Sequence, residues 1–158
     1  MKKYEFTGET KRVELWNRTA TLHRIKATVE FGFVKVGELG GWIEKEENLS
    51  HEGKAWVCGD AEVCDDAKVW GNAKVCGDAE VFLASHVLVM GSVGSRNDFT
   101  TFFRDKDNEI TVKCGCFLGK IDKFLEKVTQ THGNNKYALV YRAAVEVAKL
   151  QIELTERK

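Results

Sequence analysis

The residues best suited to bind a ligand lie in one short polar segment beyond the middle of the chain. Seven polar residues follow Gly94 within ten positions, and six of them are the candidate ligand-binding residues: Ser95, Arg96, Asn97, Asp98, Thr100 and Arg104. Arginine binds phosphate or carboxylate through paired N–H donors, and amide or carboxylate side chains hydrogen-bond to a base or sugar edge. The segment predicts a site for a small anionic molecule or nucleotide. The alternative is a structural Asx turn at Asn97 and Asp98, with Arg96 paired to Asp98.

Histidines are the second source of chemistry, because an imidazole titrates near neutral pH and can act as a general base. The chain has four: His23, His51, His86 and His132. Only His86 lies inside the repeat described next, at a position that we expect to point outward. Cys114 and Cys116 form a C-x-C pair with no second pair nearby in sequence, so we predict no metal site. Nothing in the sequence indicates a cofactor.

A six-residue repeat between Trp56 and Val93 must position these side chains. In register it reads AWVCGD, AEVCDD, AKVWGN, AKVCGD, AEVFLA and SHVLVM, with valine at 57, 63, 69, 75, 81, 87 and 93. Alanine precedes the first five valines by two residues, and residues two apart on a strand face the same side. The Gly-Asp or Gly-Asn step favours a turn. The period is typical of short parallel strands in a solenoid.

This pattern resembles the hexapeptide-repeat family, whose fold is a left-handed parallel β-helix with about 18 residues per coil. The resemblance implies a short β-helix of about two to three coils over residues 51–93. Residues 18 apart would then stack at about 4.8 Å, which places Cys58 under Cys76 and Glu62 under Glu80. The stacked carboxylates require solvent, a lysine or a cation nearby. A meander of hairpins is the alternative, but it needs longer strands.

The segments on either side predict a mainly β fold with α-helices at the C-terminus. Residues 1–50 alternate apolar and polar side chains over 19–32 and 33–44, which favours strands that cap the β-helix, with Trp42 and Ile43 filling its end. Residues 94–158 predict a β-hairpin, with strands at about 98–104 and 109–117. An amphipathic helix begins near Ile121, and a last helix spans about 136–154.

Apolar residues on one side of the last helix have two interpretations. They are Val140, Ala144, Val147, Leu150 and Leu154. Such a stripe more often packs inside its own molecule than in a coiled coil. C-terminal helices of hexapeptide proteins, however, often pack in a trimer. The outer apolar residues of the repeat (Trp70, Phe82 and Leu88) also suggest buried contacts, so we expect a homo-oligomer, with a homotrimer favoured.

Composition narrows the classes of function. The 158 residues include 24 basic and 24 acidic side chains, with a formal net charge of zero. This balance disfavours general nucleic-acid binding and a membrane-surface role. No apolar run long enough to span a membrane and no signal peptide are evident. The expected location is the cytoplasm, where the five cysteines would be reduced thiols.

Two enzymatic roles follow from the family resemblance. The best-known hexapeptide enzymes are CoA-dependent acyltransferases with a histidine base on the wall of the β-helix, and His86 is the residue that fits that role. The carbonic anhydrase relatives need three histidines around zinc, which the repeat does not supply. The repeat also lacks a long inserted loop and has too few coils for an extended CoA groove. We therefore lean toward a non-enzyme.

Outside the repeat, the chain resembles a group of small proteins encoded in phages and prophages. The resemblance rests on GELGGWIEKEENLSHEG at 37–53, GSRNDFTTFFR at 94–104, CGCF at 114–117 and THG at 131–133. It implies a phage origin and carries over no catalytic residue. Our leading hypothesis is a non-catalytic oligomeric binding protein with an anti-defence role, which sequesters a small anionic or nucleotide signal or blocks a host defence protein. The alternatives are the acyltransferase and a structural or scaffold component.

Overall fold

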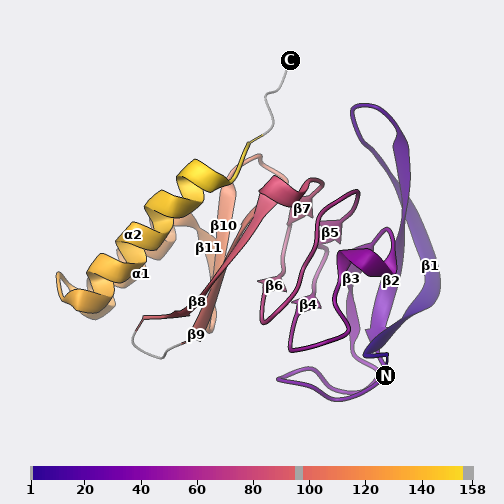
Figure 1. Cartoon of the computed structure of the whole chain (residues 1–158), viewed down its shortest axis with the longest axis horizontal. Coiled ribbons are helices and arrows are strands. Elements are labelled where there is room, and N and C mark those ends of the chain that lie inside the picture. Colours follow the sequence, from indigo (N-terminus) through magenta and orange to yellow (C-terminus); the bar gives the residue numbers. More distant parts are fainter. Residues whose placement is uncertain (1, 95–97, 155–158) are drawn as a thin grey trace.

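The computed structural model describes residues 2–94 and 98–154, which form three β-sheets and two C-terminal helices (Figure 1). The mixed sheet contains, in order, β1 (Tyr4–Glu14), β2 (Thr19–Ala27), β3 (Leu39–Ile43), β5 (Glu62–Val63) and β7 (Glu80–Val81). A parallel pair contains β4 (Trp56–Val57) and β6 (Lys74–Val75). The antiparallel sheet contains β11 (Phe117–Lys120), β10 (Ile110–Cys114), β9 (Asp98–Arg104) and β8 (Val87–Val93).

The repeat builds the core in the register that its period predicts. Glu62 pairs with Glu80 between β5 and β7, and Trp56 pairs with Lys74 between β4 and β6. The predicted inward positions are buried, because the alanines at 55, 61, 67, 73 and 79 and the valines at 57, 63, 69, 75 and 81 are each at most 1% exposed. The predicted turn glycines Gly59, Gly71 and Gly77 have positive φ. The predicted 18-residue partners, inward-facing positions and turn glycines of the repeat are therefore confirmed.

The prediction of a left-handed β-helix of two to three coils is wrong, because the strands of the repeat are divided among separate sheets. β5 and β7 extend the N-terminal sheet through β3, whereas β4 and β6 form a sheet of their own. Val69 makes only an isolated bridge to Leu49, and Val87 begins β8, which runs antiparallel to β9. The physical reason is that two-residue strands leave open edges, which longer flanking strands pair with and cover.

The N-terminal segment is a long antiparallel hairpin joined to one further strand. β1 and β2 pair along most of their length, and β3 pairs with β2 on one side and with β5 on the other. The predicted strand over 19–32 corresponds to β2, whereas β1 was not predicted. Ile43 is fully buried in the core and Trp42 packs beside Leu22 and Cys64. A short 3₁₀ turn, η1 (Glu46–Asn48), leads into the repeat.

The C-terminal segment follows its prediction closely. β9 occupies the predicted strand at about 98–104, and the second predicted strand, at about 109–117, corresponds to β10, whereas β11 was not predicted. The helix α1 (Ile121–His132) ends at Gly133, and the side chain of Asn135 caps α2 (Lys136–Gln151) by accepting a hydrogen bond from the backbone N–H of Ala138. The helices pack on the antiparallel sheet, away from the N-terminal hairpin (Figure 1).

The buried face of α2 is not the predicted stripe. Ala138, Tyr141, Ala144, Val145 and Ala148 pack against the sheet and α1. Of the predicted stripe only Ala144 is buried, whereas Val147 and Leu150 are 46% and 88% exposed. The interpretation of that stripe as intramolecular core is therefore wrong for these two residues. In residues 2–94 and 98–154, no helix has the length and apolar character needed to cross a bilayer.

The cysteines differ from the expectation of reduced thiols. Cys58 and Cys76, which the period stacks, form a disulfide between chain positions 18 residues apart. Cys64 is buried, and burial raises the pKa of its thiol to about 12. Cys114 is partly buried and Cys116 is exposed. The disulfide therefore links the residues that follow the paired strands β4 and β6.

We expect replacement of Cys76 by serine to lower the free energy of unfolding of the oxidised protein by about 3 kcal/mol, because a cross-link across a loop of this length restricts the unfolded chain. Urea unfolding followed by circular dichroism measures the change. The exposed Cys116→Ser variant is the matched control and should unfold like the wild type. Equal stability of the oxidised wild type and Cys76→Ser would contradict the cross-link.

Candidate functional site

The predicted polar segment does not converge in the part of the chain that the structure describes. Ser95, Arg96 and Asn97 lie outside the described residues. Asp98 is exposed, and its carboxylate accepts a hydrogen bond from the backbone N–H of Phe99. Thr100 is buried beside Cys114, with 3.3 Å between Oγ1 and Sγ. Arg104 is at the opposite end of β9, about 20 Å from Asp98 at the usual rise of a strand.

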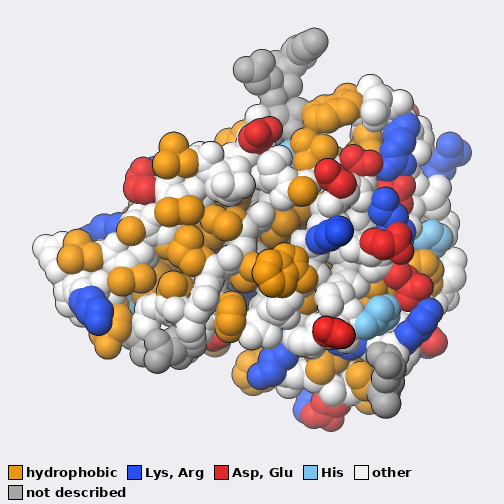
Figure 2. All heavy atoms as spheres, viewed as in Figure 1, with side chains coloured by type: hydrophobic (Ala, Val, Ile, Leu, Met, Phe, Trp, Pro, Cys, Tyr) orange, Lys and Arg blue, Asp and Glu red, His pale blue; other side chains and the backbone are white. Residues whose placement is uncertain are grey.

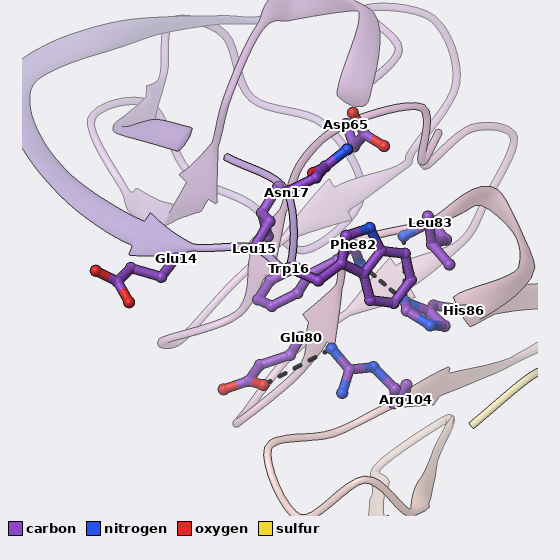
Figure 3. A pocket seen from close by; sticks show the side chains of 10 residues that line it. All are labelled: Glu14, Leu15, Trp16, Asn17, Asp65, Glu80, Phe82, Leu83, His86 and Arg104. Carbon is purple, nitrogen blue, oxygen red and sulfur yellow. Dashed lines mark hydrogen bonds and ion pairs between the residues drawn. The ribbon is translucent and has the colours of Figure 1, made fainter. Parts of the chain in front are cut away.

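Arg104 lines a cavity of about 260 Å³ on the other side of the molecule. Four parts of the chain form the cavity: the tip of the β1–β2 hairpin, a corner of the repeat at Asp65, the segment from β7 to η2 (Ala84–His86), and the end of β9 (Figure 3). The lining residues are Glu14, Leu15, Trp16, Asn17, Asp65, Glu80, Phe82, Leu83, His86 and Arg104. This cavity is the candidate functional site.

The hairpin tip is held over the repeat by an arginine. The backbone N–H of Leu15 donates to the carbonyl of Arg18, which closes the turn. The guanidinium of Arg18 then binds Glu44 at 2.6 Å and Asp65 at 3.0 Å. The hydrogen bond from Arg18 holds the pKa of Glu44 below its usual range. Trp16 is thereby placed at the rim, where its side chain is 71% exposed.

Arg104 forms the floor together with Glu80 and Phe82. Its side chain is almost buried, and one guanidinium nitrogen lies 3.8 Å from a carboxylate oxygen of Glu80. The guanidinium carbon lies 5.0 Å from the centre of the Phe82 ring, in cation–π range. The two aromatic side chains Trp16 and Phe82 therefore line the cavity beside a charged pair (Figure 3).

His86 is the most unusual group in the site. The prediction that it points outward is wrong, because the η2 turn leaves the side chain only 1% exposed. Its Nδ1 accepts hydrogen bonds from the backbone N–H groups of Phe82 and Leu83, each at 3.1 Å. The neutral ring must therefore carry its proton on Nε2. That N–H has no hydrogen-bond acceptor among the described residues, and a buried donor without an acceptor is unfavourable.

The environment keeps His86 neutral. Burial, and secondarily the positive charge of Arg104, lower the pKa of the imidazole to about 4. The lone pair on Nδ1 is already used by two backbone donors, and Nε2 carries a proton. At neutral pH the residue can donate a hydrogen bond but offers no free lone pair to a substrate, so this geometry does not suit a general base.

The charges around the cavity disfavour a polyanion. Three carboxylates (Glu14, Asp65 and Glu80) and one guanidinium line it. Asp65 is paired with Arg18, and Glu80 with Arg104. A phosphate chain inside would meet more negative than positive charge, whereas a neutral ring could accept from His86 and donate to a carboxylate. No group of acidic, histidine or cysteine side chains in residues 2–94 and 98–154 is arranged to hold a metal ion.

Sequence reasoning named Arg104 and His86 but assigned neither to this cavity. It did not find Trp16, Asp65 or Glu80 as members of a site. One local signal was available, because Ser85 breaks the alanine series just where η2 replaces a strand. No local signal indicates that Trp16 reaches the same place, since that contact depends on the fold of the whole hairpin.

The chain matches no known protein family and no curated protein.

We expect His86 to stay neutral, with its proton on Nε2, until the pH falls to about 4. An unfolded chain has a histidine pKa of about 6.5, so the unfolded state binds more protons between these values. Stability should therefore fall as the pH drops from about 6.5 toward 4. Nitrogen-15 NMR of the ring reports the tautomer and the titration.

The control for this titration is His86→Asn, whose side-chain oxygen can still accept from the backbone N–H groups but does not titrate. The stability difference between this variant and the wild type should shrink as the pH falls through the same window. A ring that titrates near 6.5, or a proton found on Nδ1, would refute the assignment.

Proposed function

We propose that the protein is a non-catalytic binding protein whose cavity holds the ring of a small heterocyclic ligand, such as the base of a nucleotide. The observation that carries the proposal concerns His86, a residue that lines the cavity: its Nε2–H is buried and lacks an acceptor among the described residues. A ring nitrogen or carbonyl of a ligand supplies that acceptor. Folded proteins rarely leave such a donor unsatisfied.

Cavity size favours one ring system over a complete dinucleotide. Small-molecule pockets usually measure about 300–1,000 Å³, and this one measures about 260 Å³. Trp16 and Phe82 supply flat apolar surfaces, on which a base can stack. Arg104 and Glu80 offer a donor and an acceptor to the edge of the ring. The phosphate of a nucleotide would remain outside, away from the carboxylates.

The biological role that we propose is sequestration. A protein that binds a nucleotide-type signal without converting it lowers the free concentration of that signal. In a phage setting this activity would blunt a host defence system from within the host cytoplasm. The chemistry of the cavity supports this role. It combines the Nε2–H donor of His86, two aromatic surfaces and a charged pair.

The experiment is isothermal titration of the protein with adenosine, guanosine, their monophosphates, inorganic phosphate and acetyl-CoA. We expect a nucleoside and its monophosphate to bind with similar affinity, because the ring carries the contacts, and phosphate alone not to bind. Trp16→Ala should weaken binding roughly 5- to 150-fold, which corresponds to the loss of one stacking contact of about 1–3 kcal/mol. His86→Asn should weaken binding as well.

The matched control is Trp70→Ala, because Trp70 is also an exposed tryptophan, at 62%, and does not line the cavity. It should bind like the wild type. Binding of acetyl-CoA or of phosphate alone, with no binding of any nucleoside, would exclude this function. Equal losses in Trp16→Ala and Trp70→Ala would show that the ligand does not occupy the cavity.

A further inference from the structure

The outward face of α2 has the pattern of a coiled-coil seam. Val140, Ala143, Val147 and Leu150 follow one another at intervals of three, four and three residues. This is the alternation of a and d positions in a heptad repeat. We call these four residues the α2 seam.

The seam lies on the side of the helix that the molecule does not use. Of the buried residues of α2, Ala138 and Val145 fall at f positions and Tyr141 and Ala148 at b positions, away from a and d, and Ala144 falls at an e position. Leu150 is 88% and Val147 46% exposed, and the flanking Leu139 is 61% exposed. Figure 2 shows hydrophobic side chains gathered over the helical end of the molecule. A contiguous apolar stripe of this kind indicates an interaction surface.

We infer that the α2 seam binds the α2 seam of a second copy of this chain, as a parallel two-stranded coiled coil. The periodicity argues for a second copy, because an a/d stripe is complementary to another a/d stripe. Valine at the a positions 140 and 147 with leucine at the d position 150 favours two strands rather than three. This number differs from the homotrimer that the sequence suggested.

Charge on the flanks favours the parallel orientation. Glu146 lies at a g position, whereas the e positions hold Ala144 and Gln151. A parallel pair places g opposite e of the partner, so Glu146 faces a neutral glutamine. An antiparallel pair places g opposite g, which brings the two acidic flanks together.

The helix is already formed by its contacts with the sheet, so association does not have to order it. Two heptads nevertheless make a short contact, at the lower end of known interface sizes. The dimer should therefore depend on concentration.

Sedimentation equilibrium of the full chain tests the inference. The wild type should change from monomer to dimer mass between about 1 and 100 µM, the range in which a micromolar contact fills. Leu150→Ser should remain a monomer throughout. Phe33→Ser is the matched control, because Phe33 is also 88% exposed but lies in the N-terminal segment, and it should dimerise like the wild type. Circular dichroism verifies that both variants fold.

A second measurement tests the orientation. In a Cys116→Ser background, Ala143→Cys and Val147→Cys are each oxidised under mild conditions. A parallel seam brings both positions next to their own copies, so both variants should form covalent dimers. An antiparallel pair can bring only one of them to its two-fold axis.

A wild type that is monomeric at about 100 µM, or one that forms a trimer, overturns the inference. It is also overturned if Leu150→Ser retains the wild-type mass or if Phe33→Ser loses the dimer equally. Cross-linking of only one cysteine variant, or of neither, overturns the parallel arrangement.

Discussion

In-register parallel stacking of the repeat is the constraint on which the rest of the structure depends. It places alanine over alanine and valine over valine in a dry interior, and it also forces Glu62 to lie beside Glu80. Like charges at neighbouring positions repel. Each carboxylate is paired with a cation from outside the repeat. Lys11 binds Glu62 at 2.6 Å, and Arg104 lies 3.8 Å from Glu80. The repeat therefore requires the flanking segments to place positive charges beside Glu62 and Glu80.

The strand that supplies Arg104 to Glu80 also joins the antiparallel sheet to the repeat. Immediately after Arg104, Asp105 bridges to Ala79, and the backbone N–H of Lys106 donates to the carbonyl of Asp78. Burial of Asp105 would raise the pKa of its carboxyl group, but hydrogen bonds from Thr111, Lys120 and two backbone N–H groups outweigh it and hold the pKa low. This charged turn fixes the end of β9, and with it the guanidinium that forms the floor of the cavity.

The sequence predicted what is local and periodic. The spacing of alanine and valine indicated the buried face and the 18-residue partners, and Gly133 and Asn135 indicated the helix boundaries. It predicted that residues 1–50 cap the repeat, but not that β3 pairs with β5 or that β9 pairs with β8, because a backbone edge attracts any strand that tertiary structure brings near. The cavity was beyond prediction for the same reason. Trp16, Asp65 and His86 lie far apart in sequence and meet only through the Arg18 contacts and the η2 turn.

The position of one proton bears on two of the three kinds of function that the sequence left open, the binding protein and the acyltransferase. An acyltransferase base needs a lone pair directed at the substrate. The η2 turn uses the Nδ1 lone pair of His86 for two backbone donors and leaves a proton on Nε2. Reversing the tautomer would set an N–H against both backbone donors, and protonating the ring is opposed by burial and by Arg104. The backbone of the turn therefore fixes this histidine as a hydrogen-bond donor.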